Sequence, residues 1–385
     1  MNPLSQLLSL SKHQKTELGL LYTPAEIAQQ PATWQVTHRL FIEKKAELIG
    51  YLQQAKTERW TIYLVGAGSS DYIGHSIAHL LRKRWNCEVC VVASTDLLTN
   101  REDLVIPDQK YLWISFSRSG DSPEGVSVLE QALATSPNVK HLVVSCNRNG
   151  RMVELALQNK RCFAMVLDDA VNDRSLAMTS SFTNMVLFGM ELAHLWDQRS
   201  FDETLQTMTQ AANYMLEDGA SLAQKLAKQG YRRACFVGSG ALAGTTRESA
   251  LKILELTAGN IQTMNETTLG LRHGPMSSLN TESLFVSFIS RDDRRRRYDL
   301  DLLNEIRAKG AVRTILAIGH ADPASDSSLY CEAFGRLDDA YRPAVDVIFS
   351  QMFGLFSSVE LGLHPDSPSP NGLISRVVEK FAIYA

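Results

Sequence analysis

Three serines surround a glycine in residues 117–124, which read SRSGDSPE. A buried apolar run precedes them, which predicts a loop at the carboxyl end of a strand. Pro123 suits the first position of a helix and makes Ser122 its N-cap. Free backbone N–H groups and the helix dipole favour an anion at such an end. Ser117, Ser119 and Ser122 are therefore candidate phosphate ligands; the alternative is a helix-capping turn.

A second cluster combines carboxylates with a lysine. Glu248, Lys252 and Glu255 are spaced i, i+4 and i+7 in a predicted helix that ends at Gly259, so they share one helix face. His273 follows at a Gly-Pro turn. A carboxylate beside a lysine, with a titratable imidazole, suits proton transfer next to a sugar carbonyl. The alternative is a solvated charged stripe, which most such patterns are.

Other polar patterns favour structural interpretations. His75 and His79 have the i, i+4 spacing of a helical metal pair, but no third ligand is evident and we expect no metal or other cofactor. Cys87 and Cys90 form a C-x-x-C pattern on a predicted strand, where residues three apart face opposite sides. The basic run at 291–297 is interrupted and followed by aspartates, which favours a solvated helix start.

The elements around these residues predict an α/β fold. Buried apolar runs occupy residues 61–65, 88–93, 111–116, 141–145 and 162–167, and helical segments separate most of them. Continuous apolar strands that alternate with helices indicate a parallel sheet covered on both faces. Residues 181–196 and 201–228 are predicted to form long helices.

The second half repeats the first at one offset. Val65 matches Val237 (237 − 65 = 172), and the same offset relates Ile114 to Val286 and Val143 to Ile315. Three strands with a shared offset indicate a duplicated α/β unit. The loop after Val286 carries bulky and acidic residues in place of Ser/Gly chemistry, so we expect only one repeat to hold phosphate.

These patterns give a domain plan with two doubly wound parallel-sheet modules. A helical N-terminal arm over 1–45 precedes the first module at 46–200, which holds the phosphate. A helical linker at 201–220 leads to the second module at 221–370, and a tail covers 371–385. The segment 66–70, GAGSS, adds Ser70 at the carboxyl end of the first strand, where parallel sheets bind ligands.

Composition excludes several classes. The 385 residues carry a net charge of −3, with 44% hydrophobic and 21% charged residues, which excludes a disordered chain. That charge gives no general attraction for nucleic acid or anionic membranes, and no apolar run approaches the roughly 18 residues of a membrane span. Without a secretory signal, and with six cysteines, the chain is expected in the cytoplasm.

Four motifs together resemble the sugar isomerase (SIS) fold. They are GxGSS at 66–70, SxSGDSPE at 117–124, ESALKxxE at 248–255 and RHGP at 272–275. The doubled module is similar to the isomerase half of glucosamine-6-phosphate synthase. Residues 95–100, 177–183, 247–259 and 298–303 resemble the AgaS family more closely, a family of galactosamine-6-phosphate deaminase/isomerases formerly described as tagatose-6-phosphate ketose/aldose isomerases.

The resemblance implies roles for the motif residues. Ser117, Ser119 and Ser122 would hold the phosphate, and Ser70 the phosphate or a sugar hydroxyl. Glu255 matches the glutamate that moves a proton between C2 and C1 of the sugar. His273 matches a ring-opening histidine that the synthase takes from a neighbouring subunit. Glu248 and Lys252 match supporting charged residues, and a homodimer is expected.

Two positions depart from the synthase pattern. Arg118 stands where the synthase has glutamine. The stretch 370–376 ends in Arg376 where the synthase carries an imine-forming lysine, and an arginine stays protonated. The chain also leaves no room for a glutaminase domain, which argues against net amino-sugar synthesis.

The function predicted from the sequence is conversion of galactosamine 6-phosphate to tagatose 6-phosphate and ammonia. The predicted partner is a phosphorylated hexose or hexosamine, with neither nucleic acid nor membrane. Alternatives are aldose–ketose isomerisation, deamination of glucosamine 6-phosphate and a non-catalytic sugar-phosphate sensor. A sensor could keep the serines and lose the base, so Glu255 together with His273 favours an enzyme.

Overall fold

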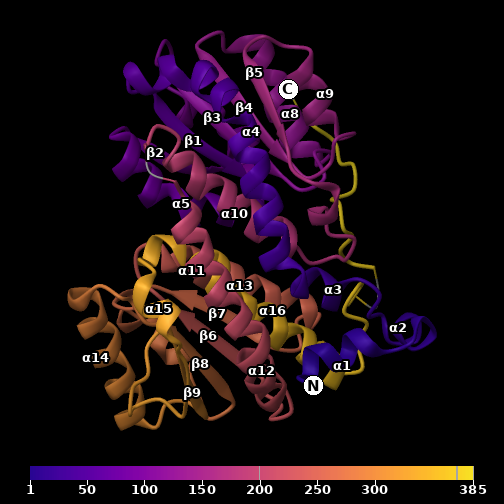
Figure 1. Ribbon diagram of the computed structural model, residues 1–385, viewed down its shortest axis with the longest axis vertical. Coiled ribbons are helices and arrows are strands. Elements are labelled where there is room, and N and C mark those ends of the chain that lie inside the picture. The colour runs from indigo at the N-terminus through magenta and orange to yellow at the C-terminus, as the bar shows by residue number, and fades with distance from the viewer. Residues whose placement is uncertain (199, 370–371, 385) are drawn as a thin grey trace. The chain divides into compact units, whose positions relative to one another are not determined.

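The computed structural model describes residues 1–198, 200–369 and 372–384. The chain forms two compact units, and each is discontinuous in sequence. The first-sheet unit comprises Ala32–Asp173, Ser180–Phe201 and Ile374–Ala385. The second-sheet unit comprises Met1–Pro31, Arg174–Thr179 and Asp202–Leu373. Figure 1 labels the elements of both units.

Five parallel strands form the sheet of the first-sheet unit, in the order β2-β1-β3-β4-β5. Their bounds are β1 (Thr61–Gly66), β2 (Val89–Ala93), β3 (Tyr111–Ser117), β4 (Val139–Ser145) and β5 (Cys162–Val166). Every residue of β1 and β3 is buried, as expected where helices cover both faces of a parallel sheet.

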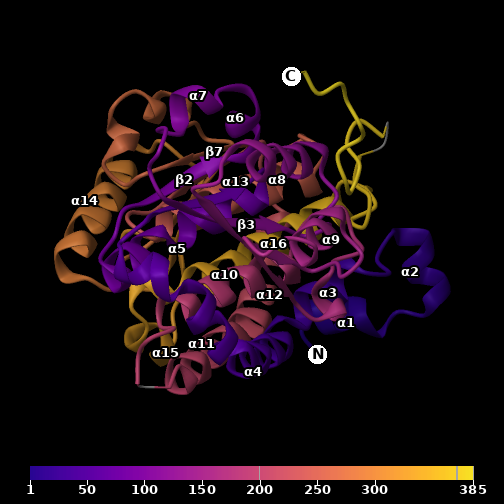
Figure 2. The same ribbon diagram turned by 90° about the horizontal axis from the view of Figure 1, so that it is seen from above.

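The helices of this unit pack in two groups, which confirms the doubly wound prediction. Helix α5 contacts α10, β1 and β2, whereas α8 contacts α6 and α9 (Figure 2). The bounds are α4 (Gln30–Thr57), α5 (Ser69–Trp85), α6 (Ser94–Thr99), α7 (Arg101–Leu104), α8 (Pro123–Thr135), α9 (Arg151–Leu157) and α10 (Ser180–Ala193). Right-handed crossovers place the helix after β1 and the helix after β3 on opposite faces of the sheet.

The second-sheet unit repeats this plan with the order β10-β9-β8-β6-β7, again parallel. Its strands are β6 (Arg233–Val237), β7 (Gln262–Glu266), β8 (Ser283–Phe288), β9 (Thr314–Ile318) and β10 (Ser327–Leu329). Its longer helices are α11 (Asp202–Tyr214), α12 (Ala220–Ala227), α13 (Leu242–Leu256), α14 (Asp293–Lys309) and α16 (Pro343–Glu360); the shorter ones are α1 (Pro3–Ser9), α2 (Lys12–Leu18), α3 (Thr23–Ala28) and α15 (Glu332–Arg336).

Strand register supports the duplication and corrects one match. Thr61 pairs with Tyr111 and Arg233 pairs with Ser283, so the central strands of both sheets keep the 172-residue offset. Val143 pairs with Ser115, but Ser287 pairs with Ala317, 174 positions after Val143 (317 − 143 = 174). The match of Val143 to Ile315 is therefore wrong by two residues, because Ser287 and its partner Ala317 are 30 positions apart, whereas Ser115 and Val143 are 28 apart.

The ends of the chain belong to different units. Residues 1–31 pack within the second-sheet unit, where the Asp366 carboxylate accepts the N–H groups of Leu21 and Thr23 at 2.7 and 2.8 Å. Residues from Ile374 onward belong to the first-sheet unit. The boundaries predicted at 45, 200 and 220 stay predictions, and the one at 370–371 lies outside the described residues.

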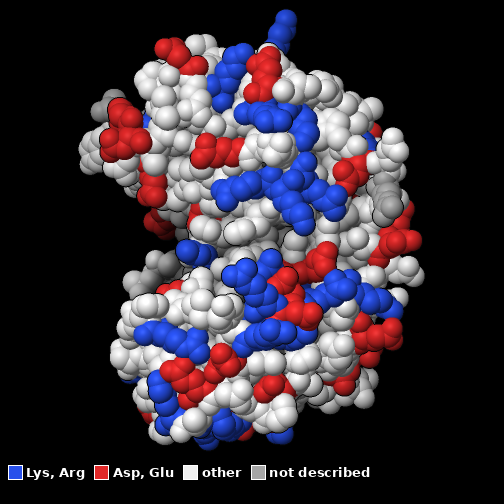
Figure 3. All heavy atoms as spheres, turned by 90° about the vertical axis from the view of Figure 1, so that its left-hand side faces the viewer, with Lys and Arg blue, Asp and Glu red and all other residues white. Residues whose placement is uncertain are grey.

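The surface carries interspersed charges. Lys and Arg side chains gather on the face shown in Figure 3, with Asp and Glu side chains among them. Among the described residues, no helix has the length and apolar composition to span a bilayer.

Candidate active site

The first sheet places two loops at its switch point, where β1 and β3 lie side by side and their connections leave in opposite directions. Ligands of open parallel sheets bind outside the carboxyl ends of the strands at such a point. The loop after β1 approaches closely, because a Cβ on Gly66 would lie 2.4 Å from the Ser70 carbonyl oxygen. Ser70 is buried in the first turn of α5, so glycine at 66 lets this turn pack against the strand end.

The serine loop after β3 is built to donate hydrogen bonds. Ser117 Oγ accepts the Gly120 N–H at 3.0 Å, and Ser119 Oγ accepts the Asp121 N–H at 3.2 Å. Neither hydroxyl hydrogen has an acceptor among the residues that the structure describes. The Ser122 side chain makes no capping bond to α8. Three hydroxyls are thus available to an anion, beside the first-turn amides of α8, which lack intrahelical acceptors.

Gly120 fixes the shape of this loop. Its φ is +68°, and a Cβ would lie 3.1 Å from the Gly150 Cα. The Gly120 carbonyl accepts the Met152 N–H at 2.9 Å, and Asn147 Nδ2 donates to the Ser119 carbonyl at 2.7 Å. The loop after β4 therefore holds the serine loop through its backbone.

A Gly120→Ala substitution is expected to destabilise this arrangement. The Cβ meets backbone at Gly150, which has no flexible side chain to move away, and the left-handed φ adds strain. We expect the free energy of unfolding to fall by about 1–3 kcal/mol. Denaturant titration measures this, with Gly68→Ala as control, since Gly68 has a positive φ but open space around its Cβ. Equal losses in both variants would show that the contact with Gly150 contributes nothing.

Arg118 contacts the C-terminal segment. Its Nη2 donates to the carbonyl of Arg376 at 2.5 Å. Arg376 in turn donates from Nε to the Asp173 carbonyl and from Nη2 to Asn172 Oδ1, both at 2.6 Å. Sequence reasoning missed this contact because the partners lie 258 positions apart. A substrate contact by Arg118 stays a prediction. Of the stretch that aligns with the synthase lysine, Pro370 and Asn371 lie outside the described residues.

The acid–base cluster lies on α13, in the second-sheet unit. Glu248 and Lys252 are fully buried, so the interpretation as a solvated stripe is wrong for both. The Lys252 ammonium lies 3.5 Å from Glu248 Oε1 and donates to Glu255 Oε2. The Glu255 side chain keeps 20% of its surface exposed. Of these three charged groups, only the Glu255 carboxylate can be reached by solvent or a substrate. The buried Lys252 ammonium holds this carboxylate in place.

His273 is exposed after a short 3₁₀ turn (η3, Gly270–Arg272) that follows β7. Its backbone N–H bonds the Gly270 carbonyl at 2.9 Å, and Arg272 Nε bonds Glu305 Oε2 at 2.7 Å. The ring of His273 makes no hydrogen bond to any residue within the described ranges. The turn is therefore anchored while the imidazole stays accessible.

Relatives of known name match nearly the whole chain. A protein of Streptomyces coelicolor that bears the AgaS name is 35% identical, over 95% of this chain and 96% of its own length. An Escherichia coli protein named D-galactosamine-6-phosphate deaminase AgaS is 33% identical, over 94% of this chain and 95% of its own. The chain belongs to the AgaS family. No family model matches it.

A solved structure agrees with this membership. The crystal structure of tagatose-6-phosphate ketose/aldose isomerase from Escherichia coli has a TM-score of 0.84 and 32% identity, over 91% of this chain and 95% of that one. The SIS fold and the AgaS resemblance expected from the motifs are thereby confirmed. The roles of the individual site residues remain predictions.

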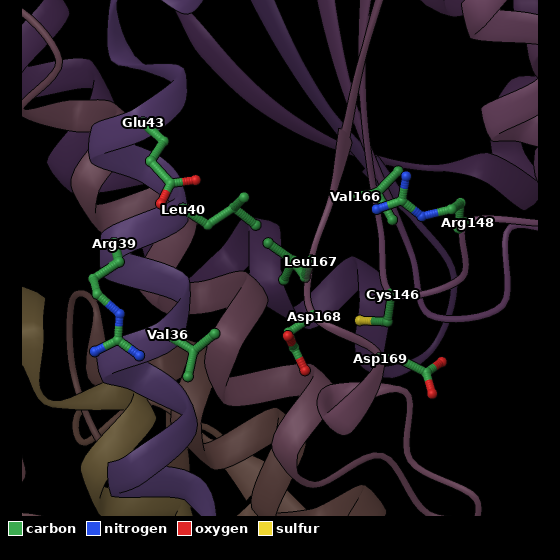
Figure 4. A pocket seen from close by; sticks show the side chains of 10 residues that line it. All are labelled: Val36, Arg39, Leu40, Glu43, Cys146, Arg148, Val166, Leu167, Asp168 and Asp169. Atoms are coloured by element: carbon green, nitrogen blue, oxygen red, sulfur yellow. The ribbon is translucent and has the colours of Figure 1, made fainter.

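This AgaS-family chain also contains a cavity of about 440 Å³ in the first-sheet unit. It lies among α4, the loop after β4 and the end of β5, where Leu40 and Leu167 point toward each other (Figure 4). None of the predicted substrate-binding residues lines it. Cys146 does, and its burial raises the pKa of its thiol, which disfavours the reactive thiolate form.

The histidine pair and the basic run lie on helices with charged neighbours. No group of three or more His, Cys, Asp or Glu side chains that could hold a metal ion occurs within the described ranges, and His75 Nε2 lies 3.4 Å from Asp71 Oδ2 on its own helix. In the basic run of α14, Arg295 pairs with Asp339 and Arg296 with Asp293, as expected for a run balanced by aspartates.

Proposed function

We propose that this chain is a deaminase/isomerase that converts galactosamine 6-phosphate to tagatose 6-phosphate and ammonia. Membership of the AgaS family supports the substrate class. The observation that carries the proposal is the arrangement on α13, where buried Lys252 holds a partly exposed carboxylate, Glu255. A positioned carboxylate is a suitable general base for a proton next to a carbonyl.

The serine loop supplies substrate binding in this proposal. The hydroxyls of Ser117, Ser119 and Ser122 donate to the phosphate oxygens, and the N-terminus of α8 adds its amides and dipole. Ser70 binds a phosphate or sugar oxygen. Phosphate binding fixes the sugar, so that proton transfer proceeds within a positioned complex and without a metal ion.

The central step of the proposed chemistry is the transfer of one proton from C2 to C1 of the sugar. His273 assists opening of the sugar ring to the aldehyde. Glu255 removes the C2 proton, the electrons of the C2–H bond form a C1=C2 double bond, and the C1 oxygen takes a proton from water to give an enolamine. Glu255 returns the proton to C1, which leaves an imine at C2. Water hydrolyses the imine to the ketone and ammonia, so substrate plus water balance ketose phosphate plus ammonia.

A Ser119→Ala variant tests phosphate binding. Loss of one hydrogen bond to a charged group costs about 1.5–3 kcal/mol, which is about 10- to 100-fold in affinity. We expect KM to rise by this factor and kcat to change little. Ser127→Ala, within α8, is the control. An unchanged KM for Ser119→Ala would remove this hydroxyl from the site.

The second candidate function is aldose–ketose isomerisation. The similarity to a solved tagatose-6-phosphate ketose/aldose isomerase favours it, and the same proton transfer gives a ketose when C2 carries a hydroxyl. Parallel measurement of ammonia and ketose release decides the matter, with galactosamine 6-phosphate, glucosamine 6-phosphate and tagatose 6-phosphate as substrates. Ammonia from the galacto substrate supports deamination. Interconversion without ammonia supports isomerisation, and no turnover of any substrate supports a sensor.

We infer further that the protein works in the cytoplasm as a homodimer. All six cysteines are free, which suits a reducing compartment. The exposed ring of His273 suits a group that serves a neighbouring subunit, as the resemblance to the synthase implies. Sedimentation velocity of the purified chain measures the assembly, and a monomer at micromolar concentration would contradict this inference.

A further inference from the structure

The second sheet has its own loop at the switch point, between β8 and α14, and two buried carboxylates fill it. Asp299 Oδ2 accepts the Ser290 N–H at 2.9 Å, and Asp339 Oδ1 accepts the Arg291 N–H at 2.8 Å. The Ser290 hydroxyl also donates to Asp339. Both aspartates are buried. The donors at this strand end are thus already engaged by the chain itself.

The contrast with the first sheet is direct. There, the hydroxyls of Ser117 and Ser119 keep their hydrogens available within the described residues, and Ser122 does not cap its helix. In the second sheet, Asp292 caps α14 by accepting the Arg295 N–H at 3.0 Å. One loop is open to an external anion, and the other is closed by internal anions.

Asp339 has the donor set of a bound oxyanion. Besides one amide and one hydroxyl, it accepts Arg295 Nη1 at 2.8 Å. The fully buried Arg342 guanidinium lies 3.8 Å from Asp339 Oδ1 and donates to Asp346 Oδ2 at 2.7 Å. Amide, hydroxyl and guanidinium donors are those that commonly hold phosphate groups in proteins.

Asp299 joins the loops that follow three strands. Besides the Ser290 amide after β8, it accepts the Thr268 hydroxyl, after β7, at 2.5 Å. Thr268 Oγ1 accepts the Ser239 hydroxyl, after β6, at 3.0 Å. The loop of Thr268 carries His273, and the loop of Ser239 leads into α13, which carries Glu255.

We propose that Asp299 and Asp339 permanently occupy the anion cradle of the second module in place of a phosphate, and that Thr268, held by Asp299, positions the loop of His273. Occupancy of the cradle by the two aspartates does not depend on the proposed function. The effect of Thr268 on turnover rests on that function, so occupancy and positioning are tested separately.

Occupancy is tested by restoring a missing carboxylate. Asp339→Ala leaves the Ser290 hydroxyl, the Arg291 amide and the Arg295 guanidinium without their acceptor. We expect its unfolding midpoint to fall by several degrees in chloride and to regain most of that loss in sodium formate at equal ionic strength. The control is Asp338→Ala, whose carboxylate is exposed and pairs with Arg291. No specific effect of formate on Asp339→Ala would overturn the occupancy.

If Asp339→Ala does not fold in chloride, refolding in formate but not in chloride gives the same positive result. Failure to refold in either salt moves the test to Asp339→Asn, which keeps one acceptor oxygen. That variant should fold and show a smaller loss without rescue by formate. A wild-type midpoint for Asp339→Asn would contradict the need for an anion.

Positioning is tested with a matched pair at Thr268. Thr268→Val removes the hydroxyl and keeps the shape, whereas Thr268→Ser keeps the hydroxyl. We expect Thr268→Val to lower kcat about tenfold with KM within twofold, and to speed hydrogen exchange of residues 267–273. Thr268→Ser should retain both wild-type values. Equal hydrogen-exchange rates in Thr268→Val and Thr268→Ser would overturn the positioning role. This readout does not depend on which reaction the protein catalyses.

The pH dependence of stability gives a further readout on Asp299. Burial raises the pKa of this carboxyl to about 6, and the neighbouring Asp339 adds to the rise, while hydrogen bonds from Thr268 and Ser290 and the Arg342 charge oppose it. The folded state therefore binds the proton more tightly than the unfolded state, and ionisation lowers stability as pH rises toward 7. Asp299→Asn should lack this fall. The unfolding midpoint of the wild type minus that of Asp299→Asn should therefore decrease from pH 4 to pH 7. A constant difference would contradict it.

Discussion

Glu255→Gln is expected to lower kcat about 10²- to 10⁴-fold while KM stays within a fewfold of wild type. The amide keeps the size and the contact to Lys252 through its oxygen, but it cannot take the C2 proton. Glu255 is the one member of the charged trio on α13 with an exposed carboxylate, so the effect should fall on chemistry more than on folding. Steady-state assay of ketose phosphate release measures it.

The matched control is Glu360→Gln, an exposed glutamate at the end of α16 in the same unit. It should keep wild-type kcat and KM. Turnover of Glu255→Gln near the wild-type rate would remove Glu255 from the mechanism. A parallel fall in thermal stability would instead show that the residue acts through the fold.

Lys252→Met is expected to cause the largest loss of stability. Lys252 is fully buried and lies between Glu248, also fully buried, and Glu255. Removing one partner of a buried pair leaves an uncompensated charge and costs about 3–5 kcal/mol. We expect a loss of this size in the free energy of unfolding, measured by denaturant titration at pH 7.

The control for this prediction is the double variant Glu248→Gln/Lys252→Met. It removes the buried negative charge together with its partner, so it should recover a large part of the stability lost by Lys252→Met. Additive losses in the two single variants would show that Glu248 and Lys252 do not interact. The double variant should still lack activity, since Glu255 has lost the ammonium that holds it.

The sheets were largely predictable because their strands are continuous apolar runs. The runs at 61–65 and 111–116 correspond to β1 and β3, whose residues are buried on both faces. The helix predicted over 201–228 is interrupted instead by a π-helical turn at Met215–Gly219. Both flanking helices keep a helical apolar period, so the sequence carries no signal for the extra residue in that turn.

The site was predictable where the residues lie in one motif. The open serine loop follows from residues 117–124, and the cluster on α13 from its helical spacing. The burial of Lys252 was not predictable from that spacing, because burial depends on how α13 packs against other elements, such as α16, which lies about 100 positions later. Asp339 was missed for the same reason: it meets Ser290 from 49 positions away. The sequence did carry one signal, because acidic residues stand after β8 in place of the Ser/Gly pattern. This replacement indicated a loop that binds no phosphate, but it did not show which carboxylates occupy the loop.

The most direct test of the proposed mechanism is turnover of galactosamine 6-phosphate in D₂O, followed by NMR of C1 in the ketose phosphate product. Transfer by a carboxylate that exchanges with solvent predicts ammonia release together with deuterium at C1 in part of the product. In the same experiment Glu255→Gln should release ammonia about 10²- to 10⁴-fold more slowly, and release at the wild-type rate would contradict the role of Glu255 as the proton carrier.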